Sequence, residues 1–243
     1  MLMKASLLPL PAEPSAGAAG CLVCQVRSRA LFSVLPAEQL PDAAARVTHA
    51  SFAAGDALYL EAQAGRSVFT IRTGIVRFER AGSDGERRIV RLAGPGALIG
   101  QEALLRQPHA ENAVACTPVE ACRLPPAAVE GFGQSYPAML RELMRRWQSA
   151  LDASGEWAAE VTRGSARRRV LKLLDQIARL QADEERVWLP SRLEMQDMLG
   201  VVPETASRAV SALRRQGVLA EVLPGSARLD RAALARALAQ ADG

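Results

Sequence analysis

Towards the C-terminus of the chain, apolar and polar residues alternate with the spacing of two short helices. The pattern from Ser191 to Val218 predicts a first helix, a tight turn at Gly200 and a second helix that begins near Pro203. Ser191 precedes Glu194 by three residues, which is the spacing of a helix capping box. The second helix has an inward stripe at helical spacing, formed by Ala206, Val210 and Leu213. Such a pair is typical of a helix-turn-helix, whose second helix enters the major groove of double-stranded DNA.

The outward face of the second predicted helix carries side chains that can contact base edges. An arginine can bond to O6 and N7 of guanine together, and a glutamate can accept from N4 of cytosine. The residues on this face are Glu204, Thr205, Ser207, Arg208 and Arg214. We therefore expect them to contact DNA. The alternative at this point is an ordinary pair of surface helices whose charged face is solvated.

Residues 45–128 contain short apolar runs that are separated by glycines at near-regular intervals. Runs of this kind predict the strands of a small β-barrel or β-roll. The sequence GSDG at 82–85 lies between two charged runs and predicts a hairpin turn. We therefore expect a β-rich domain in front of the helix-turn-helix.

One long amphipathic helix is predicted between the β-rich region and the helix-turn-helix. No proline interrupts the segment from Ala138 to Arg163, and Gly164 with Ser165 predicts its end. Its apolar side chains fall near one seam, which comprises Leu140, Leu143, Met144, Trp147 and Leu151. The same helix of a second copy would bury this seam in a parallel dimer. The alternative is that the seam packs only on the β-rich region of its own chain.

Composition narrows the class of protein. A length of 243 residues suffices for two domains, and a net charge of +4 is too small for a nucleic-acid-binding tail. Phosphate contacts must then come from locally placed arginines, namely Arg167, Arg168, Arg169, Arg192, Arg208, Arg214 and Arg215. No apolar run approaches the ~20 residues of a membrane span. Residues 1–20, interrupted by Pro9 and Pro11, predict a disordered leader and not an export signal, so we expect a cytoplasmic protein.

Four cysteines provide candidate metal or redox chemistry. Cys21 and Cys24 form a CxxC motif, and Cys116 and Cys122 lie six residues apart near the end of the β-rich region. Thiolates are natural ligands of iron–sulfur clusters and of zinc, and a CxxC can also act as a thiol–disulfide switch. The cysteines can instead be small buried hydrophobes without a chemical role. Because six extended residues span roughly 20 Å, Cys116 and Cys122 can share a cluster only if the chain turns between them.

These segments together resemble the Crp/Fnr family of bacterial transcription regulators along nearly the whole chain. FAAGDALYLEAQ, IRTGIVRF and GPGALIGQEAL are similar to landmarks of the family's β-roll, and ARRRVLKLLDQIARL is similar to the helix that opens its DNA-binding domain. The resemblance implies an α+β protein with a β-roll of the cyclic-nucleotide-binding type. After the leader at 1–20, it implies the sensor β-roll at 21–136, a dimerisation helix at 137–163 and a winged helix-turn-helix at 164–243, with Pro224–Gly225 as the turn of the wing.

The motif PETASR at 203–208 is similar to the E-x-x-S-R pattern of the Fnr branch. It implies that Glu204, Ser207 and Arg208 read a TTGAT-like half-site, and that a homodimer reads two half-sites as a palindrome. The resemblance also implies that the protein contacts RNA polymerase. We expect no enzymatic activity, because the sequence has no recognisable nucleophile–base pair and no glycine-rich phosphate loop followed by lysine.

The Fnr branch carries an oxygen-labile [4Fe–4S] cluster on cysteines. Cys21, Cys24 and Cys122 match three of its ligands, whereas Ala30 stands in place of the third N-terminal cysteine. Cys116 would complete the set of four, and the regulator would then sense oxygen, nitric oxide or redox state. The alternatives are a cluster with three cysteines and another ligand, a zinc site, a thiol switch, a haem near His109, or a small effector in the β-roll.

The residues that would hold a cyclic nucleotide are changed. Where the cAMP-receptor branch grips the ribose with a Gly-Glu pair, Gly100 is followed by Gln101. Where that branch grips the phosphate with an Arg-Ser pair, this chain has Glu111 and Asn112. A buried phosphate without a cation is costly. The sequence therefore disfavours cyclic nucleotide binding.

Overall fold

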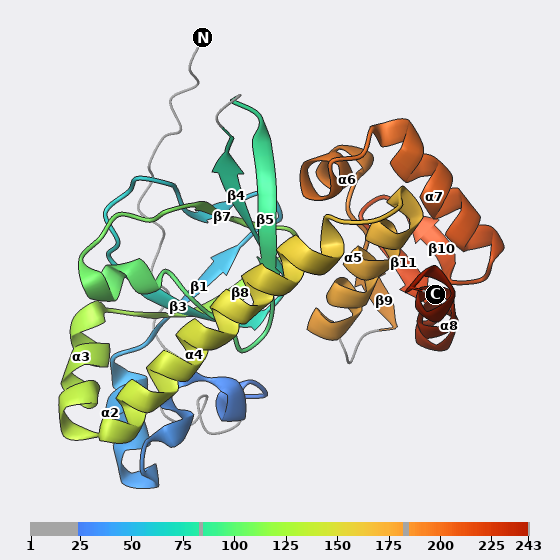
Figure 1. Cartoon of the computed structure of the whole chain (residues 1–243). Coiled ribbons are helices and arrows are strands. Elements are labelled where there is room, and N and C mark those ends of the chain that lie inside the picture. The colour runs from blue at the N-terminus through green and yellow to red at the C-terminus, as the bar shows by residue number, and fades with distance from the viewer. Residues whose placement is uncertain (1–23, 83–84, 182–184, 243) are drawn as a thin grey trace.

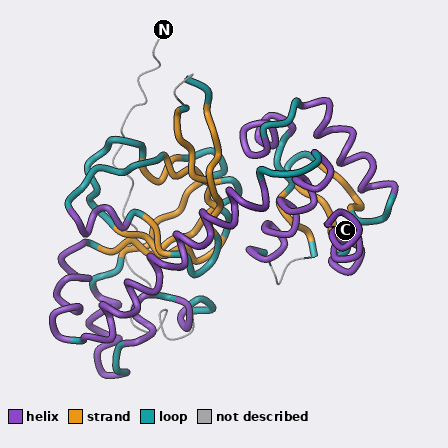
Figure 2. Tube along the Cα trace, viewed as in Figure 1, coloured by secondary structure: helices purple, strands orange, loops and turns teal. Residues whose placement is uncertain are grey.

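The computed structural model describes residues 24–82, 85–181 and 185–242 (Figure 1). The leader expected at 1–20 and Cys21 lie outside the described residues. The chain forms a β-rich part and a mainly helical part, and the long helix α4 runs along the β-rich part towards the helical one (Figures 1 and 2). This arrangement follows the order of elements that the sequence pattern predicts.

The β-rich part is built from two four-stranded antiparallel sheets. One sheet has the order β1 (Thr48–Phe52), β8 (Val119–Leu124), β3 (Val68–Thr73), β6 (Leu98–Ile99). The other has the order β2 (Ala57–Tyr59), β7 (Asn112–Ala115), β4 (Val76–Ala81), β5 (Arg87–Ala93). β4 and β5 pair as a hairpin, with Ala81 opposite Arg87, while residues 83 and 84 of the predicted GSDG turn lie outside the described residues. Phe52, Phe69 and Phe78 are buried between the two sheets, so the predicted β-roll is confirmed.

Helices cover the outer face of the first sheet. Short 3-10 turns at Arg27–Arg29, Leu31–Val34 and Ala37–Gln39 lead into α2 (Leu40–Ala45), and another lies at Gln101–Leu105. After β8 come α3 (Pro126–Ser135) and α4 (Pro137–Glu156), which continues as a π-helical turn at Trp157–Val161. Leu31, Val68, Leu124 and Met139 belong to the buried cluster between this sheet and the helices. The N-terminal segment and α4 thus share one core with the β-roll.

The helical part has the elements of a winged helix-turn-helix. Its helices are α5 (Ala166–Leu180), α6 (Arg192–Leu199), α7 (Pro203–Arg215) and α8 (Arg231–Asp242). A three-stranded sheet has the order β10 (Leu219–Leu223), β11 (Ser226–Leu229), β9 (Arg186–Trp188). The turn at Pro224–Gly225 connects β10 to β11, as expected for the wing. Ser165 caps α5 by accepting a hydrogen bond from the backbone N–H of Arg168.

The core of the helical part extends into the β-roll. Ile75, Ile89 and Leu92 of the β-roll belong to the same buried cluster as Met195 and Met198 of α6. The two parts are therefore packed against each other through apolar side chains. Among the described residues, no helix has the length and apolar character that crossing a membrane requires.

Candidate DNA-binding surface and sensor sites

The helix-turn-helix is held by the local interactions that its sequence predicts. The Ser191 hydroxyl accepts from the backbone N–H of Glu194 at 3.2 Å, and the Glu194 carboxylate accepts from the backbone N–H of Ser191 at 2.7 Å. The predicted capping box therefore opens α6. Gly200 ends α6 with a φ of +63°, a left-handed conformation that suits glycine. Pro203 occupies the first turn of α7, where its missing N–H costs little.

Helix α7 presents one polar face to solvent. Glu204, Ser207, Arg208 and Arg214 are exposed, while Thr205 is half-buried. An Arg208 Nη donates a hydrogen bond to the Thr205 hydroxyl at 3.2 Å, which holds the guanidinium along the helix. The predicted inward residues are confirmed as buried, together with one further alanine: Ala206, Ala209, Val210 and Leu213. The candidate DNA-contacting residues thus share a single accessible surface.

Two of the arginines expected to contact phosphates stabilise the hinge between α4 and α5. Arg168 forms an ion pair with Glu160 at 2.6 Å and also donates to the backbone carbonyl of that residue. Arg169 donates to the carbonyls of Gly164 at 2.9 Å and Leu199 at 2.7 Å. Both guanidinium groups thus donate hydrogen bonds within the chain, and their contacts with phosphates stay a prediction. A run of consecutive arginines in the sequence does not tell which of them contacts the hinge and which contacts a phosphate.

The seam predicted on α4 divides between two environments. Leu140, Met144 and Leu151 are 51%, 58% and 67% exposed, and Trp147 is half-buried. These four residues follow one another at spacings of four, three and four, which is the heptad spacing of a paired helix. Leu143, which was expected in the same seam, is buried in the core beneath α4. Its assignment to the seam is therefore corrected.

The structure brings Cys24 and Cys122 together at one apolar pocket. Both side chains line this pocket, whose walls come from the N-terminal turns, α2 and β8. Cys122 projects from the outer face of its sheet and packs against the cluster that contains Leu31 and Leu124. Across β1 and β8, His49 lies directly opposite Cys122, so the imidazole and the thiol share that face. The sequence alone does not connect His49 with Cys122, because only the pairing of β1 with β8 makes them neighbours.

Cys116 lies in a different environment. It follows β7 and packs against the core of the helical part. Burial raises the pKa of its thiol to about 12, although the nearby Arg77 guanidinium favours the thiolate. The chain does turn at Thr117–Pro118, but β7 and β8 belong to opposite sheets of the roll. The described residues therefore do not assemble the set of four cysteines, and within them no group of three or more histidine, cysteine or acidic side chains is arranged to hold a metal ion.

His109, which carried the haem alternative, is engaged inside the β-roll. Its ring is buried and stacks on Tyr59 with 3.8 Å between centroids. Its Nδ1 lies 3.4 Å from a carboxylate oxygen of Glu102. These contacts account for His109 as a packed core residue.

The site expected for a cyclic phosphate contains an internal ion pair. Glu111 is buried and pairs with Arg91, whose guanidinium lies over the Phe78 ring at 3.3 Å from its centroid. The neighbouring Asn112 side chain accepts a hydrogen bond from the backbone N–H of Glu61 at 2.8 Å. Sequence reasoning identified Glu111 but missed Arg91, which comes from the neighbouring hairpin. A phosphate at this position would face a carboxylate whose arginine is already engaged.

Cyclic AMP and cyclic GMP are therefore expected to produce no saturable heat on titration into the protein in calorimetry. The Glu111 carboxylate repels a phosphate, and binding would have to separate it from Arg91. A saturable isotherm with either nucleotide would contradict this prediction. A Glu111→Gln variant tells whether the charge or the shape of the site opposes the nucleotide, because it keeps the side-chain volume but removes the negative charge.

A β-roll, a long helix with an exposed apolar seam and a winged helix-turn-helix define a class of DNA-binding regulators. The family model described as cyclic nucleotide-binding domain matches residues 49–136. The transcriptional activator protein FnrL of Cereibacter sphaeroides is 31% identical over 209 residues, which is 82% of this chain and 84% of the relative. The chain therefore belongs to the Crp/Fnr family of transcription regulators.

Two further comparisons agree with this assignment. The nitrogen fixation regulation protein FixK of Bradyrhizobium diazoefficiens is 29% identical over 217 residues, covering 87% of this chain and 91% of the relative. The solved structure of FixK2 from Bradyrhizobium japonicum superimposes with a TM-score of 0.68 and 27% identity, covering 78% of this chain and 96% of that one. The family resemblance stated from sequence motifs is thus confirmed, and with it the α+β fold.

Proposed function

We propose that the protein is a homodimeric transcription activator that reads a TTGAT-like palindrome with Glu204, Ser207 and Arg208. The observation that carries this proposal is the exposed row of these three side chains on α7. They lie in the N-terminal half of the helix, which is the half that approaches base edges in a helix-turn-helix. Arg208 suits a bidentate contact with guanine, and Glu204 suits the amino group of cytosine. Thr205, between Glu204 and Ser207, and Arg214, nearer the end of α7, suit contacts with the DNA backbone.

The experiment compares a duplex that contains a TTGAT-like palindrome with a shuffled duplex of the same composition. Binding is followed by fluorescence anisotropy at several salt concentrations, since phosphate contacts alone depend steeply on salt and carry no sequence preference. A preference of roughly 1,000-fold is typical of specific regulators. Equal affinity for the two duplexes would overturn the proposal.

The exposed seam of α4 supports the dimer. Leu140, Met144 and Leu151 would meet the same residues of a second copy, with Trp147 among them, in a parallel pair of helices. The pairing would bring two α7 helices to adjacent half-sites related by a two-fold axis. A dimer bound in this way is the form in which we expect the protein to contact RNA polymerase.

For the sensor, we place the reactive thiols at the pocket that Cys24 and Cys122 share. The two cysteines come from segments far apart in the chain, and Cys21 precedes Cys24 by three residues. Three thiolates and one other ligand suit an iron–sulfur cluster or zinc, and two thiols at one pocket suit a redox-controlled disulfide. A [4Fe–4S] cluster on four cysteines does not fit, because Cys116 packs against the other core.

Variants of the cysteines are expected to separate into two groups. Cys24→Ser and Cys122→Ser should lose most of the iron, sulfide or zinc that the wild-type protein carries when purified without oxygen. Cys116→Ser should retain it, because burial raises the pKa of Cys116 to about 12 and keeps the thiol protonated at neutral pH. Metal analysis with a visible spectrum checks this result.

If the anaerobically purified protein holds no metal, the same variants test the disulfide. Counting thiols before and after mild oxidation should then show two fewer in the wild type and in Cys116→Ser. In Cys24→Ser and in Cys122→Ser, the one remaining thiol of this pair should stay open to alkylation. A loss of metal or of the disulfide in Cys116→Ser equal to that in Cys24→Ser would contradict the placement of the sensor.

A further inference from the structure

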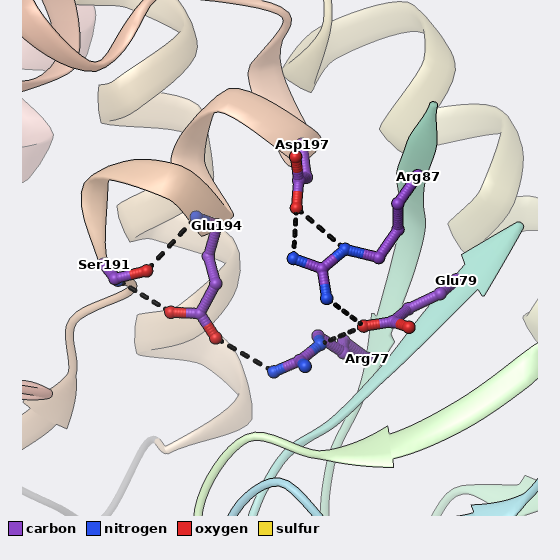
Figure 3. A network of polar contacts seen from close by, with 6 residues as sticks. All are labelled: Arg77, Glu79, Arg87, Ser191, Glu194 and Asp197. Carbon is purple, nitrogen blue, oxygen red and sulfur yellow. Dashed lines mark hydrogen bonds and ion pairs between the residues drawn. The ribbon is translucent and has the colours of Figure 1, made fainter. Parts of the chain in front are cut away.

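Five charged residues connect the β4–β5 hairpin to α6, the first helix of the helix-turn-helix (Figure 3). Arg87 donates to one carboxylate oxygen of Asp197 through Nε at 2.9 Å and Nη2 at 2.5 Å. Arg77 donates to Glu194 at 2.9 Å. Glu79 lies between the two arginines, 2.6 Å from Arg77 and 3.3 Å from Arg87. We call these five residues the interdomain network.

Four members of the interdomain network are largely shielded from water. The side chains of Glu79, Arg77, Asp197 and Glu194 are 9%, 12%, 15% and 21% exposed, whereas that of Arg87 is 46% exposed. Removing one member of a shielded pair leaves its partner's charge poorly compensated. The loss of stability is therefore larger than when an exposed surface pair is broken. Ile89 of β5 packs beside the network in the same buried cluster as Met198 of α6. Apolar contact and directed ion pairs together therefore hold α6 in one orientation on the hairpin.

The orientation of α6 determines that of the recognition helix. Met195 and Met198 of α6 are buried in one cluster with Val210 and Leu213 of α7, so the two helices move as a unit. The hairpin belongs to the β-roll, whose other sheet shares a core with α4. A fixed contact between hairpin and α6 thus relates the recognition helix to the exposed seam of α4.

We propose that the interdomain network sets the half-site spacing that the dimer accepts. This inference rests on the proposed function, in which the seam of α4 forms the two-fold axis. The distance between two recognition helices then depends on the angle at which each helix-turn-helix sits against its own β-roll. Arg77, Arg87, Glu194 and Asp197 are specificity-determining residues in this sense, although Glu194 and Asp197 use their carboxylates within the protein and not on DNA.

The experiment measures affinity for a series of palindromes that share their half-sites and differ in the spacer by one or two base pairs in either direction. A fragment with a single half-site completes the series. The wild-type protein should show one sharp optimum, since half-sites must match the separation of the two helices. Arg87→Gln and Asp197→Asn should each reduce the preference for the optimal spacer by roughly tenfold, and leave affinity for the single half-site unchanged.

Two further variants make the result specific to the interdomain network. Arg80→Gln removes the same charge from the same hairpin, at an exposed arginine for which the described chain shows no ion pair, and should keep the wild-type optimum. The conservative variant Arg87→Lys keeps a positive charge between Glu79 and Asp197 and should retain the spacer optimum that Arg87→Gln loses. Circular dichroism on every variant confirms that the helix-turn-helix remains folded, and Asp197→Asn carries the test if Arg87→Gln unfolds.

The outcomes distinguish the role of the interdomain network from the proposed dimer on which it rests. If wild type shows a sharp optimum and Arg87→Gln keeps it unchanged, the role of the interdomain network is overturned while the palindrome-reading dimer stands. If Arg87→Gln weakens the single half-site as much as the palindrome, the network supports only the folding of the DNA-binding part, and the inference is again overturned. If wild type has no preferred spacing, the dimeric proposal itself fails.

Discussion

A Met144→Glu variant is expected to be a monomer with greatly reduced affinity for a palindromic site. Met144 is 58% exposed at the middle of the seam, where the dimer would place it against its own copy. Two glutamates at that position would set like charges against each other inside an apolar contact. Losing the second DNA-binding part removes the gain from bivalent binding, so affinity should fall by roughly 100-fold or more. Light scattering after gel filtration and anisotropy titration measure the two effects.

Ser149→Glu is the matched control for this variant. Ser149 is exposed on α4 away from the seam, and its hydroxyl donates to the carbonyl of Arg145 at 2.9 Å. The substitution adds the same charge to the same helix, yet we expect a dimer with nearly unchanged affinity. A Met144→Glu protein that stayed dimeric would place the dimer contact on a surface other than α4.

Arg208→Ala is expected to remove most of the discrimination between a TTGAT-like palindrome and a shuffled duplex. The exposed guanidinium, held along the helix by Thr205, suits two hydrogen bonds to one guanine. Losing such a contact costs about 1–3 kcal/mol at each half-site, which corresponds to a tenfold or greater loss of preference. Competition between labelled and unlabelled duplexes measures the preference directly.

Arg167→Ala provides the comparison, because Arg167 lies on α5 and its guanidinium donates to the side chain of Gln216 at 3.2 Å. At that position it suits a phosphate contact without sequence information, so its loss should weaken both duplexes alike and lower the salt dependence by about one unit. If Arg208→Ala also weakened both duplexes equally, the assignment of Arg208 to base recognition would be wrong.

The helix-turn-helix could be predicted from sequence because local rules specify it. A capping box at Ser191, a left-handed glycine at Gly200 and proline in the first turn of α7 act within a few residues of each other. The buried stripe of α7 follows from helical periodicity alone. No distant part of the chain has to be known for these features, and the structure confirms each of them.

The division of the α4 seam could not be predicted in the same way. Leu143 and Met144 are adjacent apolar residues on a helix that has two apolar faces, one against the β-roll and one against solvent. Periodicity identifies apolar positions but does not tell which protein surface covers each face. Glu142 and Arg146 form a buried ion pair, 2.8 Å apart, on the face of α4 that packs against the β-roll. A hydrophobicity pattern assigns charged residues to solvent, so it places this face wrongly.

The contacts of the cysteines could not be predicted from sequence either, because they depend on which strands lie in which sheet. Cys116 and Cys122 are close in sequence, but they follow or occupy strands of opposite sheets and reach different cores. Cys24 and Cys122 are far apart in sequence and line one pocket. The ion pair between Arg87 of β5 and Asp197 of α6 likewise joins residues 110 positions apart. Spacing along the chain is informative within one element, whereas sheet pairing decides contacts between elements.

Glu194 gives α6 a direct means of responding to the β-roll. One of its carboxylate oxygens accepts from the N–H of Ser191 and closes the capping box, while the other accepts from Arg77. The start of the helix and the attachment of the domain therefore depend on the position of one side chain. A displacement of the hairpin would pull on the carboxylate that closes the first turn. Fraying of α6 at Ser191 would then report strain between the β-roll and the helix-turn-helix, so a single carboxylate links the order of one helical turn to the contact between the two parts.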